Sequence, residues 1–203
     1  MTRGGLRERK KAQTRKRLAD TAFAMFRERG FDAVTVAEIA DACDIAVSTL
    51  FAYFPSKESL VFDQEAAHEQ QLAQAVRDRP ADTAILDALE TYLAAPKPRH
   101  PGDPSREEFL DLVHTTPALR DHFMRMQRNW ETTLAHAIAA EAGLPDDDLQ
   151  ARALARFALD IGALAQESPD PAQALRTLFA RLRKGWTDFP HPQTTPRPNA
   201  GSR

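Results

Sequence analysis

The sequence predicts an all-α protein made of two helical regions. Apolar residues recur three or four positions apart through most of the 203 residues, which is the spacing of one helix face. Thr35 and Ser105 each stand three residues before a glutamate, the spacing of a capping box at a helix start. No segment shows the alternation of apolar and polar residues that a half-buried strand needs. The predicted architecture is a small N-terminal three-helix domain containing a helix-turn-helix, followed by a larger helical domain.

The composition is that of a globular protein, because 42% of the residues are hydrophobic and 28% are charged. No stretch has the roughly eighteen consecutive apolar residues of a membrane span, and no apolar run follows the basic N-terminus as in a secretory signal. A cytoplasmic location is therefore expected. The single Cys43 excludes an internal disulfide framework and a multi-cysteine zinc site, and neither a cofactor nor a metal is expected.

The first sixty residues carry an excess of positive charge. Eleven basic and eight acidic side chains give residues 1–60 a net charge of +3, whereas the remainder has −5 and the whole chain −2. Residues 1–13 are predicted to form a basic flexible arm. A first helix follows and ends at Gly30, a C-cap glycine after a basic last turn. The capping box at Thr35 begins a second helix.

A short third helix over Val47–Phe54 completes a helix-turn-helix. It is stopped by Pro55, which cannot continue a helix and disfavours helical geometry in the residue before it. Two short helices joined by a tight turn and packed on a longer one form this motif, whose second helix can enter the major groove of DNA. Ser56 can cap a fourth helix that runs through Phe62, so the domain is predicted to cover residues 14–62.

The letters TVAEIA at 35–40 and VSTLFAYFPSKESL at 47–60 strongly resemble the DNA-binding region of TetR-type transcriptional regulators. The likeness combines the capping threonine, the Tyr-Phe pair, the proline and the lysine after it at fixed spacings. It implies a regulator that binds a double-stranded DNA operator. Two positions depart from the family pattern: Asp44 stands where the family often has glycine, and Ala46 stands where it often has a capping serine.

The residues expected to contact DNA are Thr35, Val47, Ser48, Thr49, Phe51, Tyr53, Lys57, Arg15 and Lys11. The resemblance implies that Ser48 and Thr49 face base edges or nearby phosphates and that Lys57 meets a phosphate. The third helix carries no Arg, Lys, Asn or Gln, so base readout should be modest. Affinity should then depend on phosphates and on the basic arm, which could reach an adjacent minor groove. The residues expected in the small core instead are Phe26, Ile39, Ile45, Leu50 and Phe54.

Residues 63–189 are predicted to form a helical ligand-binding and dimerisation domain. Its predicted helix starts, each a cap or a proline at the first helical position, are Asp82, Ser105, Pro117, Asp146 and Pro171. The tail over residues 190–203 is rich in proline and small polar residues and is predicted to be disordered.

Aromatic and apolar residues of the middle helices form the predicted effector site. They are Tyr92, Phe109, Phe123, Met126, Asn129, Trp130 and Leu134. Such a stripe is more often core than pocket, and that alternative stays open. The last two helices are apolar on more than one face, which predicts a two-fold homodimer, although both helices could instead be central in their own domain. The expected interface residues are Leu154, Ala158, Ile161, Leu175, Leu178 and Leu182.

Together the residues and the resemblance imply a repressor that binds a palindromic operator as a homodimer and is released by a small apolar or aromatic molecule. The alternative is a ligand-free DNA-bound activator or an architectural DNA-binding protein. An enzyme is not expected, because no two histidines have the spacing of a helical metal pair and no glycine-rich phosphate loop is present. Cys43 is expected to be a small buried residue, with a redox-sensor role as the alternative.

Overall fold

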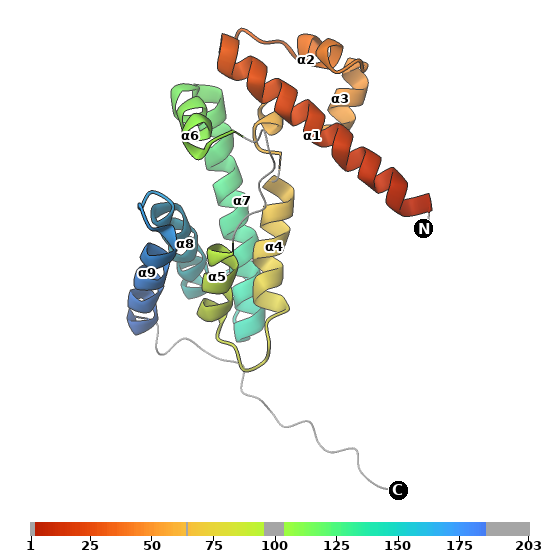
Figure 1. The fold of residues 1–203 in the computed structure, drawn as a ribbon. Coiled ribbons are helices and arrows are strands. Elements are labelled where there is room, and N and C mark those ends of the chain that lie inside the picture. The colour runs from red at the N-terminus through yellow and green to blue at the C-terminus, as the bar shows by residue number, and fades with distance from the viewer. Residues whose placement is uncertain (1–2, 64, 96–103, 186–203) are drawn as a thin grey trace, which may run out of the picture. The chain divides into compact units, whose positions relative to one another are not determined.

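The computed structural model describes residues 3–63, 65–95 and 104–185, and the regular structure in these ranges is helical (Figure 1). The elements are α1 (Arg3–Arg29), α2 (Val36–Ala42), α3 (Val47–Tyr53), the 3-10 turn η1 (Glu58–Leu60), α4 (Glu65–Arg77), α5 (Ile85–Ala94), α6 (Arg106–Thr115), α7 (Pro117–Ala142), α8 (Leu149–Ala165) and α9 (Pro171–Gly185). The predicted all-α fold is therefore confirmed. No helix of these ranges is long and apolar enough to cross a membrane.

The chain divides into two compact units, which we describe separately. Unit one contains Met1–Ala67 and Lys97–Gln127, and therefore α1, α2, α3, η1, α6 and the first part of α7. Unit two contains His68–Pro96 and Arg128–Arg203, and therefore most of α4, α5, the rest of α7, α8 and α9. The predicted disordered tail over residues 190–203 lies outside the described residues.

Helix α1 begins at Arg3, so the prediction of a flexible arm is wrong from that residue onward. The segment is rich in Arg, Lys, Glu, Gln and Ala, which have high helix propensity. Extending an existing helix also avoids the unfavourable nucleation step, because each added residue gains one hydrogen bond. Within unit one, the N-terminal part of α1 extends past α3 (Figure 1). Sequence patterning missed this because the segment has no apolar stripe.

The predicted helix from Ser56 to Phe62 is also absent from the structure. The chain makes the short turn η1 instead, and α4 begins at Glu65. The hydroxyl of Ser56 accepts from the backbone N–H of Ser59 at 3.2 Å, and the hydroxyl of Ser59 donates to the carbonyl oxygen of Ser56 at 2.7 Å. These reciprocal bonds close a single turn and compete with a continuing helix.

The core of unit one lies where α1 packs against α2 and η1. Phe26, Ile39, Leu50 and Phe54 are all buried there as predicted, whereas Ile45 is half-buried. Gly30 ends α1 with φ 84, a left-handed conformation that glycine adopts without steric cost. The small core thus fixes α2 and α3 on the C-terminal half of α1.

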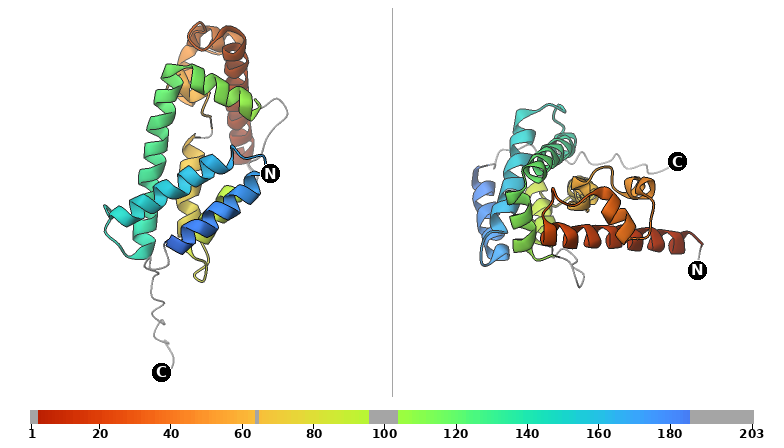
Figure 2. Two further views of the ribbon diagram at one scale, coloured as in Figure 1. Left: turned by 90° about the vertical axis from the view of Figure 1, so that its left-hand side faces the viewer. Right: turned by 90° about the horizontal axis from the view of Figure 1, so that it is seen from above.

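In unit two, α9 packs on α8 and α5, which lie side by side with it (Figure 2). Leu89, Ile138, Leu154 and Phe179 belong to the buried cluster that holds these helices together. The clustered side chains come from α4, α5, α7, α8 and α9, so each of these helices contributes to one continuous core.

The starts of the later helices agree with the sequence at three positions and shift at two others. Ser105 forms the predicted capping box at α6, and Pro117 and Pro171 begin α7 and α9 as predicted. However, α5 begins at Ile85 rather than at Asp82. Asp148 rather than Asp146 caps α8, because its carboxylate accepts from two backbone N–H groups of the first turn. Three consecutive aspartates, Asp146 to Asp148, could each cap the helix, so the sequence pattern did not identify the correct one.

Candidate nucleic-acid interface

The start of α2 is fixed by a complete capping box. The hydroxyl of Thr35 accepts from the backbone N–H of Glu38 at 3.2 Å, and the carboxylate of Glu38 accepts from the backbone N–H of Thr35 at 2.7 Å. The guanidinium of Arg29 adds a 2.6 Å ion pair to the same carboxylate. The bond from the Thr35 backbone and the bond from Arg29 together lower the pKa of Glu38 to about 2. The predicted Thr35 cap is confirmed.

The turn between α2 and α3 requires an unusual backbone conformation at Asp44, which has φ 51. Aspartate tolerates this left-handed region better than most residues, so it can stand where the family often has glycine. The backbone N–H of Ile45 donates to the carbonyl oxygen of Ala40 at 3.0 Å and closes the turn. Arg17 donates to the carbonyl oxygen of Cys43 at 2.8 Å, which ties the turn to α1.

Helix α3 has one buried face and one exposed face. Leu50 is fully buried, which anchors the helix on the core of unit one. Val47 and Phe51 are 37% and 46% exposed, and Ser48 and Thr49 are exposed beside them. Large apolar side chains seldom remain this exposed in a cluster unless a partner covers them. The structure therefore brings four of the sequence-predicted residues together on one uncharged face.

Arg15 binds other groups of unit one, although its side chain is still partly exposed. Its guanidinium donates to the carbonyl oxygen of Tyr53 at 2.6 Å and to the carboxylate of Asp63 at 2.5 Å. It also lies 4.3 Å from the centre of the Phe54 ring. These contacts join α1 to the C-terminal end of α3. Arg15 therefore holds the orientation of α3, a function that the sequence pattern did not reveal.

Lys57 is similarly engaged. Its ammonium group donates to the carbonyl oxygen of Phe31 at 2.5 Å and lies 4.2 Å from the centre of the Phe31 ring. Burial lowers the pKa of Lys57 from its ordinary value, because the surroundings disfavour the charged form. The side chain thus links the segment after α3 to the loop after α1. The expected phosphate contact of Lys57 stays a prediction.

The N-terminal part of α1 carries several exposed basic residues. Arg7, Arg9, Lys10 and Lys11 are all exposed on this helix. Lys11 was expected at the interface, whereas the other three were assigned only to a flexible arm. Their helix propensity was the signal that could have identified them as part of a helix. The result is a cationic helical segment beyond α3.

The predicted effector residues are divided between the two units. Phe109, Phe123 and Met126 belong to unit one, where Phe109 and Phe123 lie 5.7 and 6.1 Å from Phe62, measured between ring centres. The rest belong to unit two, where their environments differ from buried core to exposed surface. These are Tyr92, Asn129, Trp130 and Leu134. The seven residues therefore do not form one cluster within either unit.

Three of the predicted dimer residues are covered by their own chain. Leu154, Ala158 and Leu175 are 1%, 0% and 3% exposed and belong to the core of unit two. A side chain that its own chain covers has no surface left for a partner, so the prediction is wrong for these three. The other three predicted residues are half-buried: Ile161, Leu178 and Leu182.

The exposed apolar residues of α8 lie elsewhere on the helix. Leu149, Phe157 and Leu164 are 77%, 46% and 56% exposed. Phe157 and Leu164 are seven residues apart and therefore share a helix face. None of these three residues was among the expected interface residues. Because α8 is apolar over a wide arc, periodicity could not tell which side its own core covers.

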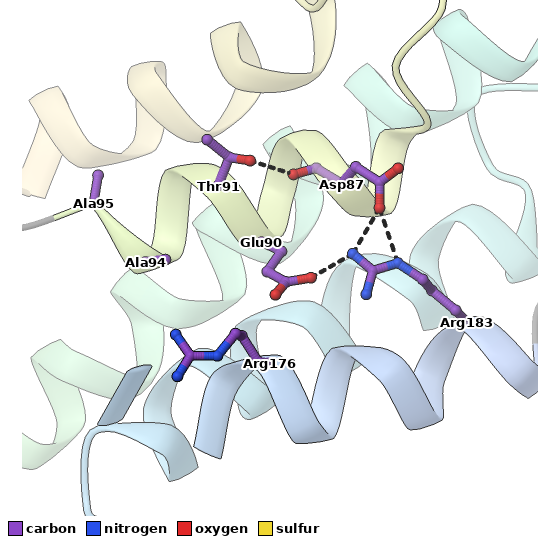
Figure 3. A pocket seen from close by; sticks show the side chains of 7 residues that line it. All are labelled: Asp87, Glu90, Thr91, Ala94, Ala95, Arg176 and Arg183. Carbon is purple, nitrogen blue, oxygen red and sulfur yellow. Dashed lines mark hydrogen bonds and ion pairs between the residues drawn. The ribbon is translucent and has the colours of Figure 1, made fainter. Parts of the chain in front are cut away.

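A surface recess lies between α5 and α9 in unit two (Figure 3). Arg183 forms ion pairs there with Asp87 at 2.6 Å and with Glu90, which link α9 to α5. Arg176, which also lines the recess, donates to the side-chain oxygen of Gln173 at 2.8 Å. None of the predicted effector residues lines the recess.

A short helix, a tight turn and a second helix with an uncharged exposed face, held on a third helix, define a helix-turn-helix DNA-binding protein. Comparison with known families agrees: residues 18–63 match the family described as bacterial regulatory proteins, tetR family, and residues 83–187 match the MftR C-terminal domain. The chain belongs to the TetR family of transcriptional regulators.

Relatives of known name support this assignment. The chain is 31% identical over 156 residues to the HTH-type transcriptional regulator TcmR of Streptomyces glaucescens, covering 73% of this chain and 69% of that protein. It is 27% identical over 160 residues to the putative mycofactocin biosynthesis transcriptional regulator MftR of Mycobacterium tuberculosis, covering 78% and 81%. Among solved structures, Salmonella enterica GusR has the same fold, with a TM-score of 0.54, 20% identity, and coverage of 86% and 94%. Both TcmR and MftR are named as transcriptional regulators.

Proposed function

We propose that this TetR-family regulator is a repressor that binds a palindromic operator as a homodimer and is released by a small apolar or aromatic molecule. The observation that carries the proposal is the exposed face of α3. It is anchored on the opposite side by Leu50 and oriented by Arg15, so it is presented rigidly. Rigid presentation lowers the entropic cost of binding a fixed partner surface.

Base readout in this proposal comes from apolar and hydroxyl groups. Val47 and Phe51 can contact thymine methyl groups, and Ser48 and Thr49 can donate to or accept from base edges or phosphates. Tyr53 flanks this face, and the N-terminus of α2 at Thr35 supports a phosphate contact. Arg15 and Lys57 act through positioning, because their charged groups already bind carbonyl oxygens of unit one.

Phosphate attraction comes from α1 in this proposal. A helix is about 10–12 Å wide with its side chains, whereas the minor groove is about 6 Å wide. The helical segment that carries Arg7, Arg9, Lys10 and Lys11 is therefore too wide to enter the minor groove as a flexible arm would. We propose that it lies along the phosphate backbone beside the groove that α3 enters.

Dimerisation is proposed through the exposed apolar side of α8. Leu149, Phe157 and Leu164 give this helix apolar surface that its own core leaves open to solvent, and two copies could cover it mutually. A two-fold dimer presents two recognition helices to half-sites about 34–36 Å apart. Effector binding would then lower operator affinity by the difference between its affinities for the two dimer conformations.

Selection of bound DNA from a random pool, at two salt concentrations, tests the proposal. We expect an enriched palindrome at both concentrations and weaker retention at the higher one, because counterion release drives the phosphate contacts. Phe51→Ala is the matched variant, and it should keep salt-dependent retention while enriching the palindrome about tenfold less strongly. A pool without a palindrome, or one that Phe51→Ala enriches equally well, would contradict the assignment of α3.

A further inference from the structure

The indole nitrogen of Trp130 is the one buried side-chain nitrogen or oxygen atom in the described part of the chain that lacks a hydrogen-bond partner. Buried polar atoms in folded proteins are nearly always paired, since an unpaired buried donor is unfavourable. Trp130 as a whole is only half-buried, so part of its side chain reaches the surface while the nitrogen is covered. An acceptor atom from a bound molecule would therefore be favourable at this nitrogen.

The Trp130 ring belongs to a series of aromatic contacts that joins three helices of unit two. The His68 ring of α4 lies edge-on to the Trp130 ring of α7, with ring centres 4.4 Å apart. The Tyr92 hydroxyl of α5 lies 2.7 Å from Nδ1 of His68 and donates to Gln71 at 3.3 Å. We call His68, Tyr92 and Trp130 the aromatic triad. Its members were drawn together from segments far apart in the sequence.

The chemistry of the triad restricts what could bind there. An indole N–H donates and cannot accept, so the missing partner must offer an acceptor atom. Glu69 follows His68 along α4 and is hydrogen-bonded to Thr133, one turn from Trp130 on α7. Its carboxylate would repel an anion. Burial raises the pKa of Tyr92, so the triad's hydroxyl stays neutral and the surroundings disfavour charge.

We infer that the aromatic triad binds the effector, and that this effector is an uncharged, flat molecule whose carbonyl oxygen accepts from Trp130 Nε1. The inference rests on the proposed function, which supplies the effector without identifying it. It names the polar contact and the charge of that molecule. The aromatic rings of the triad favour a flat ring system, and the unpaired donor selects a ketone, aldehyde or ester over a hydrocarbon.

Three probes with one ring system test the inference on DNA-free protein: acetonaphthone, ethylnaphthalene and naphthoate. Trp186→Phe leaves Trp130 as the single tryptophan, so the indole signal of nitrogen-15-labelled protein reports this site alone. We expect the ketone to move that signal downfield and to bind about tenfold more tightly than the hydrocarbon, the effect of one added hydrogen bond. The carboxylate should bind more weakly than the ketone.

Trp130→Phe keeps an aromatic ring and removes the donor. In calorimetry this variant should bind the ketone and the hydrocarbon equally, and circular dichroism checks that it remains helical. The inference is overturned if no probe moves the indole signal, if ketone and hydrocarbon bind alike, or if Trp130→Phe keeps the preference. The proposed function is tested separately by the selection of a palindrome from random DNA. That experiment uses none of the three probes, so the two failures can be told apart.

Discussion

In unit one the guanidinium groups of Arg15 and Arg17 and the ammonium group of Lys57 each donate to a backbone carbonyl oxygen, whereas in unit two the indole N–H of Trp130 has no acceptor. The first unit thus uses its strongest donors to hold α2 and α3 in place. The exposed face of α3, with Val47, Ser48, Thr49 and Phe51, contains no charged side chain. The second unit has an indole N–H without an acceptor in a ring that packs on another aromatic ring. A rigid surface suits a partner of constant shape, and an unpaired donor suits a ligand that comes and goes.

The largest effect should separate two neighbouring residues of α3. Leu50→Ala should lower the free energy of unfolding by about 2–5 kcal/mol, because it removes a fully buried side chain from the small core. Phe51→Ala should leave that free energy nearly unchanged and weaken operator binding by about tenfold. Urea unfolding and fluorescence-anisotropy titration measure the two quantities. Equal losses of stability in the two variants would contradict the assignment of one face of α3 to the core and the other to DNA.

Arg15→Met should have the next largest effect. It removes charge-assisted hydrogen bonds to Tyr53 and Asp63, which together should cost about 1.5–3 kcal/mol of stability, reduced by the partial exposure of the side chain. Lys11→Met is the matched control, because Lys11 is exposed on the same helix. It should leave unfolding unchanged and lower the salt slope of operator binding by about 1. If Lys11→Met destabilises the fold as much as Arg15→Met, the positioning assignment of Arg15 is wrong.

A charge on the open face of α8 should weaken self-association. Leu164→Glu would place a carboxylate in the proposed interface and should raise the dimer dissociation constant by at least about tenfold, or about 1.4 kcal/mol. Ala140→Glu adds the same charge at an exposed position of α7 and should leave association unchanged. Analytical ultracentrifugation over a concentration series measures both. Unaltered association of Leu164→Glu would move the interface away from this face.

The smallest effect concerns the capping box of α2. Glu38 has a lowered pKa, so its ionised form stabilises the folded state fully above the ordinary value of 4.5, and this contribution is lost as pH falls toward about 2. Glu38→Gln should therefore unfold at a lower urea concentration than the unsubstituted protein at pH 6, and the difference should shrink with acidification. Urea midpoints measured between these pH values check it. A difference independent of pH would mean that charge is not the cause.

The sequence predicted the features that depend on local chemistry. The capping box at Thr35, the left-handed turn at Asp44 and the burial of Leu50 each follow from neighbours within a few residues. The length of α1 was underestimated because a helix without an apolar stripe gives no periodic signal. The dimer residues were misassigned at Leu154 because its burial depends on helices distant in sequence.

The aromatic residues show the same limit in the candidate effector site. The sequence proposed Tyr92 and Trp130 as possible ligand contacts, but it grouped them with Phe109 and Phe123 of the other unit. Helical spacing places residues on a face without saying which partner that face meets. The contact of Trp130 with His68 joins α7 to α4, so only the tertiary structure reveals the unpaired nitrogen.

The central claim is that α3 reads DNA from both halves of a two-fold dimer, and hydroxyl-radical footprinting of a selected operator tests it most directly. The account predicts two protected tracts on one side of the duplex, centred about 10 base pairs apart or a multiple of that, and Phe51→Ala should need about tenfold more protein to protect both. A single protected tract, or two tracts that Phe51→Ala protects at an unchanged protein concentration, would contradict it.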